Sequence, residues 1–119
     1  FFAVIFSAGH LTQEVRDRDA DLGNGIHTNA VKFGKKRVFI VSFALFTFAD
    51  ALLILLALNG AVPQGLALVV AAIYPLHLHW TLQAMREGLP FQSVRRLQIR
   101  YRALYAGMGA VMIMSVLLT

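Results

Sequence analysis

The charged residues of this chain are confined to two short segments, and this distribution strongly limits what the chain can fold into. All 11 Lys and Arg residues lie within 7–37 and 84–102. The run between them, from Val38 to Leu58, contains Asp50 as its single charged residue. At about 1.5 Å per residue, a helix of this length crosses a hydrocarbon core of roughly 30 Å. The pattern therefore predicts membrane-spanning helices.

The composition agrees with a membrane protein. The chain is 58% hydrophobic and 14% charged, whereas soluble domains are nearer half apolar and a quarter charged. These values exclude a disordered tail and a fibrous repeat. The absence of cysteine from the sequence excludes disulfide frameworks, thiolate metal sites and cysteine nucleophiles.

Three spans are expected from the apolar runs, at 38–58, 66–85 and 101–118, with Pro75 inside the second. Two crossings separate the two basic segments, which places both on one side of the membrane. The connecting turn at 59–65 carries no charge, and the positive-inside pattern then makes the basic side cytoplasmic. The net charge of +5 follows from this topology and requires no nucleic acid. We expect an all-α, multi-pass transmembrane helical bundle in a bacterial inner membrane or an organelle membrane.

The first residues of the chain are expected to end a transmembrane helix at 1–9 whose start lies upstream. Residues 1–119 are then a single membrane domain that is incomplete at its N-terminus. Residues 10–37 are expected to form a cytoplasmic, Asp-rich helix and loop. On a helix, residues three and four apart share one face, which places five polar side chains on one stripe: His10, Gln13, Glu14, Asp17 and Asp21.

Carboxylates on one stripe repel each other, and a divalent cation would relieve the repulsion. Carboxylate and carbonyl oxygens favour Mg²⁺ or Mn²⁺ over Zn²⁺. Mg²⁺ commonly bridges such carboxylates to substrate phosphates, which the nearby Lys32, Lys35 and Lys36 would also bind. The alternative interpretation is a solvated helix face in which Arg16 and Arg18 pair with the acids.

The segment from Gln13 to Gly34, QEVRDRDADLGNGIHTNAVKFG, resembles the second aspartate-rich motif of the UbiA superfamily of intramembrane prenyltransferases. Asp17 and Asp21 stand at the second and third acidic positions of that motif. Six further residues match the tail of the motif: Gly25, Thr28, Ala30, Val31, Phe33 and Gly34. The chain departs from the family at Gln13, which replaces the first acid, and at His27, which replaces a common Lys or Arg.

The resemblance implies the C-terminal part of a nine-helix bundle around a central cavity, with the motif on the cytoplasmic side. It implies Mg²⁺-dependent transfer of a prenyl group from a prenyl diphosphate to an aromatic or other lipophilic acceptor, with Mn²⁺ as an alternative ion. Asp17 and Asp21 are the expected catalytic residues and first metal ligands, followed by Gln13, Glu14 and Asp19. Lys32, Lys35 and Lys36 are the expected diphosphate contacts. The first aspartate-rich motif is expected in an N-terminal half that this chain lacks, so the chain alone is expected to be inactive.

The rival hypothesis is a non-enzymatic multi-pass membrane protein, either a cation transporter or a scaffold. Asp50 would then be the transport residue and the acidic helix a surface feature. For Asp50 a role in a cavity wall and a hydrogen bond to a neighbouring helix both stay open. One further group is expected to form an interfacial aromatic belt in membrane lipid, with contact to a prenyl chain or an acceptor ring as the alternative. It comprises Tyr74, His77, His79 and Trp80.

Overall fold

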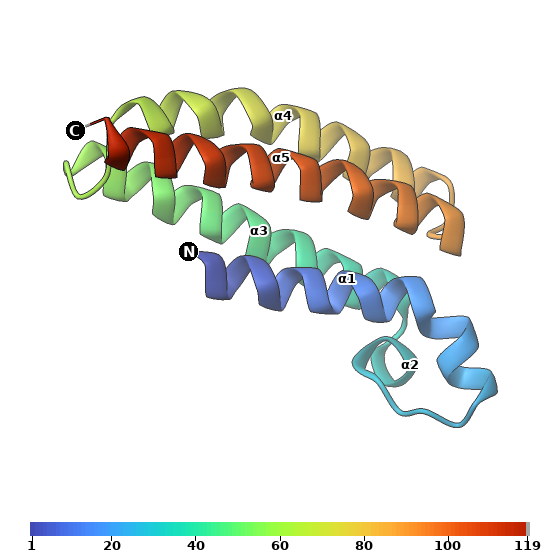
Figure 1. Ribbon diagram of the computed structural model, residues 1–119. Coiled ribbons are helices and arrows are strands. Elements are labelled where there is room, and N and C mark those ends of the chain that lie inside the picture. Colours follow the sequence, from blue (N-terminus) through green and yellow to red (C-terminus); the bar gives the residue numbers. More distant parts are fainter. Residues whose placement is uncertain (119) are drawn as a thin grey trace.

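A computed structural model describes residues 1–118, and all the regular secondary structure in this part of the chain is helical, with no strand. The helices are α1 (Phe2–Gly23), α2 (Asn29–Phe33), α3 (Lys35–Leu58), α4 (Gly65–Arg86) and α5 (Phe91–Leu117). Figure 1 shows the four long helices running side by side, with the short α2 beneath the C-terminal end of α1. Short connections join α3 to α4 and α4 to α5, which makes these neighbours antiparallel.

The four long helices pack in a closed order. Helix α1 packs on α3, α3 on α4, α4 on α5, and α5 returns to α1. Helix α1 starts part-way along the bundle and extends past its other end, where α2 contacts both α1 and α3 (Figure 1). The core between the helices is aromatic at its centre, where the Phe46 ring lies 4.9 Å from the Tyr101 ring and 5.5 Å from the Tyr105 ring.

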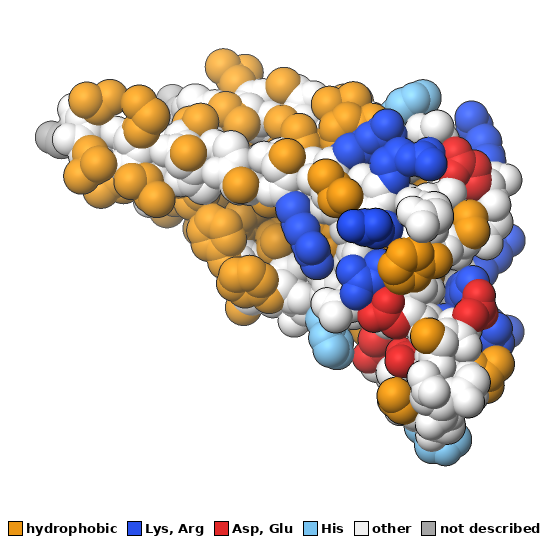
Figure 2. Space-filling view, turned by 45° about the vertical axis from the view of Figure 1, so that its right-hand side comes forward, with side chains coloured by type: hydrophobic (Ala, Val, Ile, Leu, Met, Phe, Trp, Pro, Cys, Tyr) orange, Lys and Arg blue, Asp and Glu red, His pale blue; other side chains and the backbone are white. Residues whose placement is uncertain are grey.

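Two of the helices, α3 and α4, are long and apolar enough to cross a membrane by length and composition. Helix α4 continues through Pro75. Helix α5 begins at Phe91, so the predicted span at 101–118 and the basic residues before it belong to one continuous helix. Figure 2 shows the Lys and Arg side chains gathered at one end of the molecule, with hydrophobic side chains along the remainder.

The Asp-rich region does not form a separate unit, because α1 joins the apolar residues 2–9 and the acidic residues 14–21 in one helix. The helix α2 that follows is capped at its N-terminus by Thr28, whose hydroxyl accepts a hydrogen bond from the backbone N–H of Val31 at 3.3 Å. Gly34 separates α2 from α3 with φ of 91° and ψ of 151°. This conformation is essentially restricted to glycine, and it lets α3 begin directly after α2.

The structure corrects the expected aromatic belt at His77. This side chain is only 2% exposed, and its ring lies 4.9 Å from the Phe46 ring and 5.5 Å from the Tyr101 ring. The reason is helical geometry: residues two apart point in very different directions, so His77 faces the core while His79 stays exposed. Trp80 lies beside the guanidinium of Arg100, whose Cζ is 5.4 Å from the ring centroid.

The aromatic centre of the core predicts a large stability difference between two phenylalanines of α3. Phe46 is 2% exposed and Phe48 is 58% exposed. Replacing Phe46 by Ala leaves a cavity and should lower the unfolding free energy by about 3–5 kcal/mol. Phe48→Ala, the matched control, should change it by less than about 0.5 kcal/mol. Unfolding of the purified protein in detergent, followed by circular dichroism, measures both, and equal losses would contradict this packing.

Candidate functional site

A groove of about 630 Å³ runs between α1 and α5. Its apolar lining combines aromatic and aliphatic side chains of α1 with small residues of α5: Phe2, Ile5, Phe6, Ala106 and Gly109. The small residues leave the space open, since a Cβ added at Gly109 would lie 4.0 Å from the Phe2 ring. One long wall of the groove is therefore suited to a flexible hydrocarbon chain.

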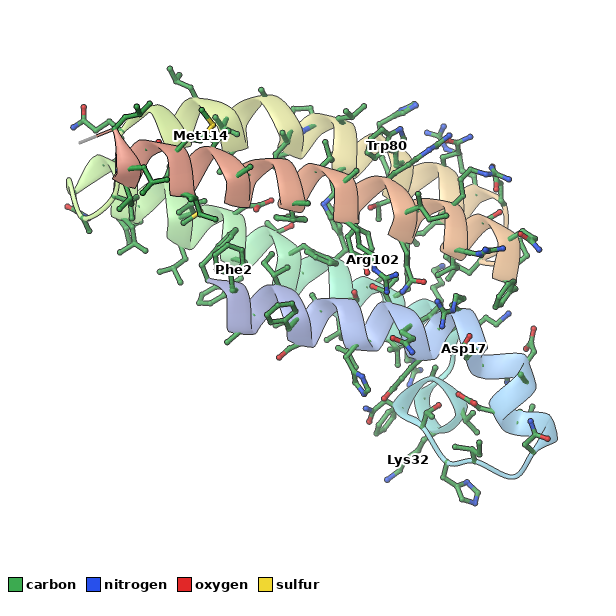
Figure 3. All side chains as sticks on the ribbon, viewed as in Figure 1. Phe2, Asp17, Lys32, Trp80, Arg102 and Met114 are labelled. Atoms are coloured by element: carbon green, nitrogen blue, oxygen red, sulfur yellow. The ribbon has the colours of Figure 1, made fainter. Side chains whose placement is uncertain are left out.

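The other end of the same groove is polar. His10 and Gln13 reach it from α1, and Tyr101 and Arg102 reach it from α5. Figure 3 shows Arg102 between α5 and α1, with Phe2 toward the start of α1 and Asp17 further toward its C-terminal end. The groove thus joins an apolar wall to a cationic end, which is an arrangement suited to an amphiphile with an anionic head.

Asp17, the first of the two predicted catalytic residues, is bound to its neighbour on α1. Arg16 donates to both carboxylate oxygens, Nε to Oδ1 at 2.8 Å and Nη2 to Oδ2 at 2.9 Å. The third guanidinium nitrogen donates to Oε1 of Gln98 on α5 at 2.9 Å. The hydrogen bonds from Arg16 lower the pKa of Asp17, and Asp17 in turn raises the pKa of Arg16. Arg16 therefore fixes the Asp17 carboxylate and connects α1 to α5.

Asp19 lies off this groove and is paired with two basic residues. Its carboxylate accepts from Lys35 Nζ at 2.9 Å and from Arg18 Nη1 at 3.1 Å. The Lys35 ammonium, followed by the Arg18 guanidinium, lowers the pKa of Asp19. Lys35 also donates to the carbonyl of Leu89 at 3.4 Å. The structure thus places Lys35, a predicted diphosphate contact, in an ion pair with a predicted metal ligand.

Glu14 faces the loop before α2. One carboxylate oxygen accepts from the backbone N–H of Asn29 at 3.0 Å, and the other lies 3.3 Å from Nε2 of His10. Lys32 lines an open hollow of about 780 Å³ together with Glu14 and His27. This hollow lies on the α2 side of α1, so Lys32 and the α1–α5 groove are on different faces of the motif helix.

The remaining predicted site residues form fewer contacts with other side chains. Gln13 is exposed at the polar end of the groove. Among the described residues, the side chains of Asp21 and Lys36 have no hydrogen bond or ion pair. Within the same range, no three His, Asp or Glu side chains come together to hold a metal ion. Glu14, Asp17 and Asp19 contact different partners, so the described residues do not bring the five predicted ligands together.

Two residues that contact the predicted site residues or line the groove, Gln98 and Tyr105, were not identified from the sequence. Gln98 is buried and accepts a hydrogen bond from Arg16. Tyr105 lines the groove and donates to both carboxylate oxygens of Asp50, at 3.0 and 3.1 Å. The hydrogen bond to a neighbouring helix, one of the two roles left open for Asp50, is therefore present between α3 and α5.

The ion pair of Asp17 predicts a dependence of stability on pH. Because the pKa of Asp17 is lower in the folded protein, the pair stabilises fully above the ordinary carboxyl pKa near about 4, and the effect disappears as the pH falls through the lowered value. At about pH 7, Asp17→Asn should lower the melting temperature, and the unfolding free energy should fall by less than about 1 kcal/mol. As the pH falls through the lowered pKa of Asp17, the difference in melting temperature between the variant and the parent should shrink toward zero. Asp21→Asn is the control, and a loss of the same size in that variant would contradict the assignment.

Comparisons of the chain with protein-family models, with curated proteins and with solved structures find no match.

Proposed function

We propose that this chain forms part of a membrane prenyltransferase of the UbiA type. The enzyme transfers a prenyl group from a prenyl diphosphate to an aromatic or other lipophilic acceptor, and this chain supplies the second aspartate-rich motif. The observation that carries the proposal is the α1–α5 groove, which is apolar along Phe2, Phe6 and Ala106 and polar at Gln13 and Arg102. The motif helix α1 forms one wall of this groove, and Gln13 of the motif is part of the lining.

The two ends of the groove have different tasks in this proposal. The apolar wall holds the isoprenoid chain and excludes water, which would otherwise capture an allylic cation. Cleavage of the carbon–oxygen bond leaves negative charge on the diphosphate. Arg102, at the polar end of the groove, stabilises that charge, because a guanidinium forms charge-assisted hydrogen bonds to phosphate oxygens.

The metal requirement of the proposal comes from the resemblance. A bound Mg²⁺ or Mn²⁺ ion would neutralise diphosphate charge. Asp21, whose carboxylate has no partner among residues 1–118, is the residue most open to such an ion. Asp17 is held by Arg16, and an ion–diphosphate complex would have to compete with that pair. Gln13, Glu14 and Asp19 are the further proposed ligands in this chain, and the remaining ligands would come from the first aspartate-rich motif, expected outside this chain.

The proposed topology is multi-pass, with α3, α4 and residues 101–118 as spans and the Asp-rich end in the cytoplasm. It is supported by the charges collected at one end of the bundle in Figure 2. The sequence has no cysteine, which allows single cysteines to report sidedness. Cysteine at Lys36 or Arg95 should react with an impermeant maleimide only from the cytoplasmic side, and cysteine at Gln64 only from the opposite side. Labelling of all three from one side would contradict the topology.

A transfer assay on the intact protein in membranes tests the function. With a radiolabelled prenyl diphosphate, a panel of lipophilic acceptors and added Mg²⁺, we expect product that disappears with a chelator. Asp21→Asn and Asp17→Asn should each reduce kcat by about 100-fold. Glu87→Gln, a change at an acid outside the motif, is the control and should keep full activity.

The proposed role of the groove in binding the prenyl chain is tested by placing a large side chain in it. Ala106→Phe should reduce kcat/KM for a long prenyl diphosphate by about 10-fold or more, because the ring occupies the space of the chain. Ala103→Phe, an equal change at an exposed position of α5 outside the groove lining, should have little effect. No turnover with any acceptor, combined with cation flux that Asp50→Asn abolishes, would instead favour the transporter.

A further inference from the structure

The four long helices meet inside the bundle at a cluster of five polar side chains, here called the polar junction. It consists of one residue each from α1, α3 and α5 and two from α4: Thr12, Ser42, Tyr101, His77 and Thr81. All five are at most 3% exposed. The junction is separate from the α1–α5 groove and from the aspartate-rich motif, except that the Tyr101 side chain borders both spaces.

One half of the junction is internally hydrogen-bonded. The hydroxyls of Thr12 and Ser42 lie 2.5 Å apart, and each also lies close to the carbonyl oxygen of Ala8, at 3.0 and 2.8 Å. Two hydroxyl protons serve these three contacts. Both hydroxyl protons are therefore used in hydrogen bonds between the two hydroxyls and to the carbonyl. The hydroxyl oxygens keep lone pairs that can accept further hydrogen bonds.

The other half of the junction lacks such partners. Among the described residues, no hydrogen bond reaches Nδ1 of His77 or the hydroxyl of Thr81. The hydroxyl of Tyr101 approaches Thr12 and Gln98 without completing a well-aligned hydrogen bond. Buried polar groups in folded proteins almost always have a partner, either a protein atom or an ordered water.

A small cavity lies between these groups. It is lined by the five junction residues together with apolar side chains that include Phe39, Phe46 and Leu97. It offers about 10 Å³ to the centre of a water-sized sphere, which is close to the minimum for one water molecule. No carboxylate, Lys or Arg side chain is part of the described lining, so the cavity has no charge to hold an ion. Its volume excludes an organic ligand.

We propose that one ordered water molecule occupies this cavity and bridges α4 to the other three helices. The water accepts from the hydroxyls of Thr81 and Tyr101, and it donates to Nδ1 of His77 and to a lone pair of Ser42 or Thr12. These four bonds satisfy the groups that the protein leaves unpaired, and they lie within the usual range for a buried water. The site is thus a structural water site built from all four long helices.

Nuclear magnetic resonance of the intact protein in detergent micelles, with ¹⁵N-labelled histidine, tests the proposal. The ring signal of His77 is assigned by its loss in His77→Gln. We expect a cross-peak between this ring and a long-lived water in the parent protein. Thr81→Val keeps the side-chain shape but removes one partner, so it should reduce the cross-peak several-fold.

A second threonine provides the matched control. The hydroxyl of Thr47 on α3 forms a hydrogen bond with the hydroxyl of Tyr74 on α4 at 3.0 Å. Because this bond lies outside the junction, Thr47→Val should leave the His77 cross-peak unchanged. Circular dichroism establishes that each variant is folded. Absence of the cross-peak in the parent protein would overturn the proposal, as would a cross-peak that Thr81→Val leaves at full strength.

Discussion

The bundle depends on a hydrogen-bonded contact between α1 and α3, where Thr12 and Ser42 share the carbonyl of Ala8. In lipid the hydrophobic effect does not draw helices together, and close packing and hydrogen bonds must select the partners. The alanine at position 8 is fully buried, which brings the backbones close enough for both hydroxyls to reach one carbonyl. This contact places α1 on α3, and the position of α1 in turn creates the groove with α5.

The charged end of the molecule is organised by the same helix. Arg16 binds Asp17 on α1 and Gln98 on α5, while Glu14 binds the loop before α2. The acids of the motif are thereby directed to different neighbours instead of to one point. Arg16 thereby couples the position of the Asp17 carboxylate to the packing of α1 against α5.

Much of the fold follows from the pattern of charge and hydrophobicity. The apolar run 38–58, in which Asp50 is the single charged residue, and the Gly- and Pro-containing turn after it correspond closely to α3 and its end. The helical spacing of the acids likewise agrees with their place in α1. The sequence could not show that α5 starts at Phe91, because the basic residues there weaken the apolar signal although the helix itself continues.

Less of the candidate site could be predicted from the sequence. Helical spacing places Glu14 and Asp17 on neighbouring positions, but it cannot tell that Asn29 binds the first while Arg16 binds the second. The groove depends on the distance between α1 and α5, which are far apart in the chain. His77 was misplaced because an aromatic group near the end of a span looks the same in sequence whether it faces lipid or core. Burial is decided by the rotation of α4 against α3 and α5.

Lys35 has a mechanical consequence. Its ammonium joins the Asp19 carboxylate on α1 to the carbonyl of Leu89 in the turn after α4, and it does so from the first residue of α3. Leu89 is buried and has a φ of 58°, an uncommon conformation for a residue with a side chain. Three segments distant in the chain are therefore held by one side chain. The acidic end of α1 is hence linked through Lys35 to the turn between α4 and α5.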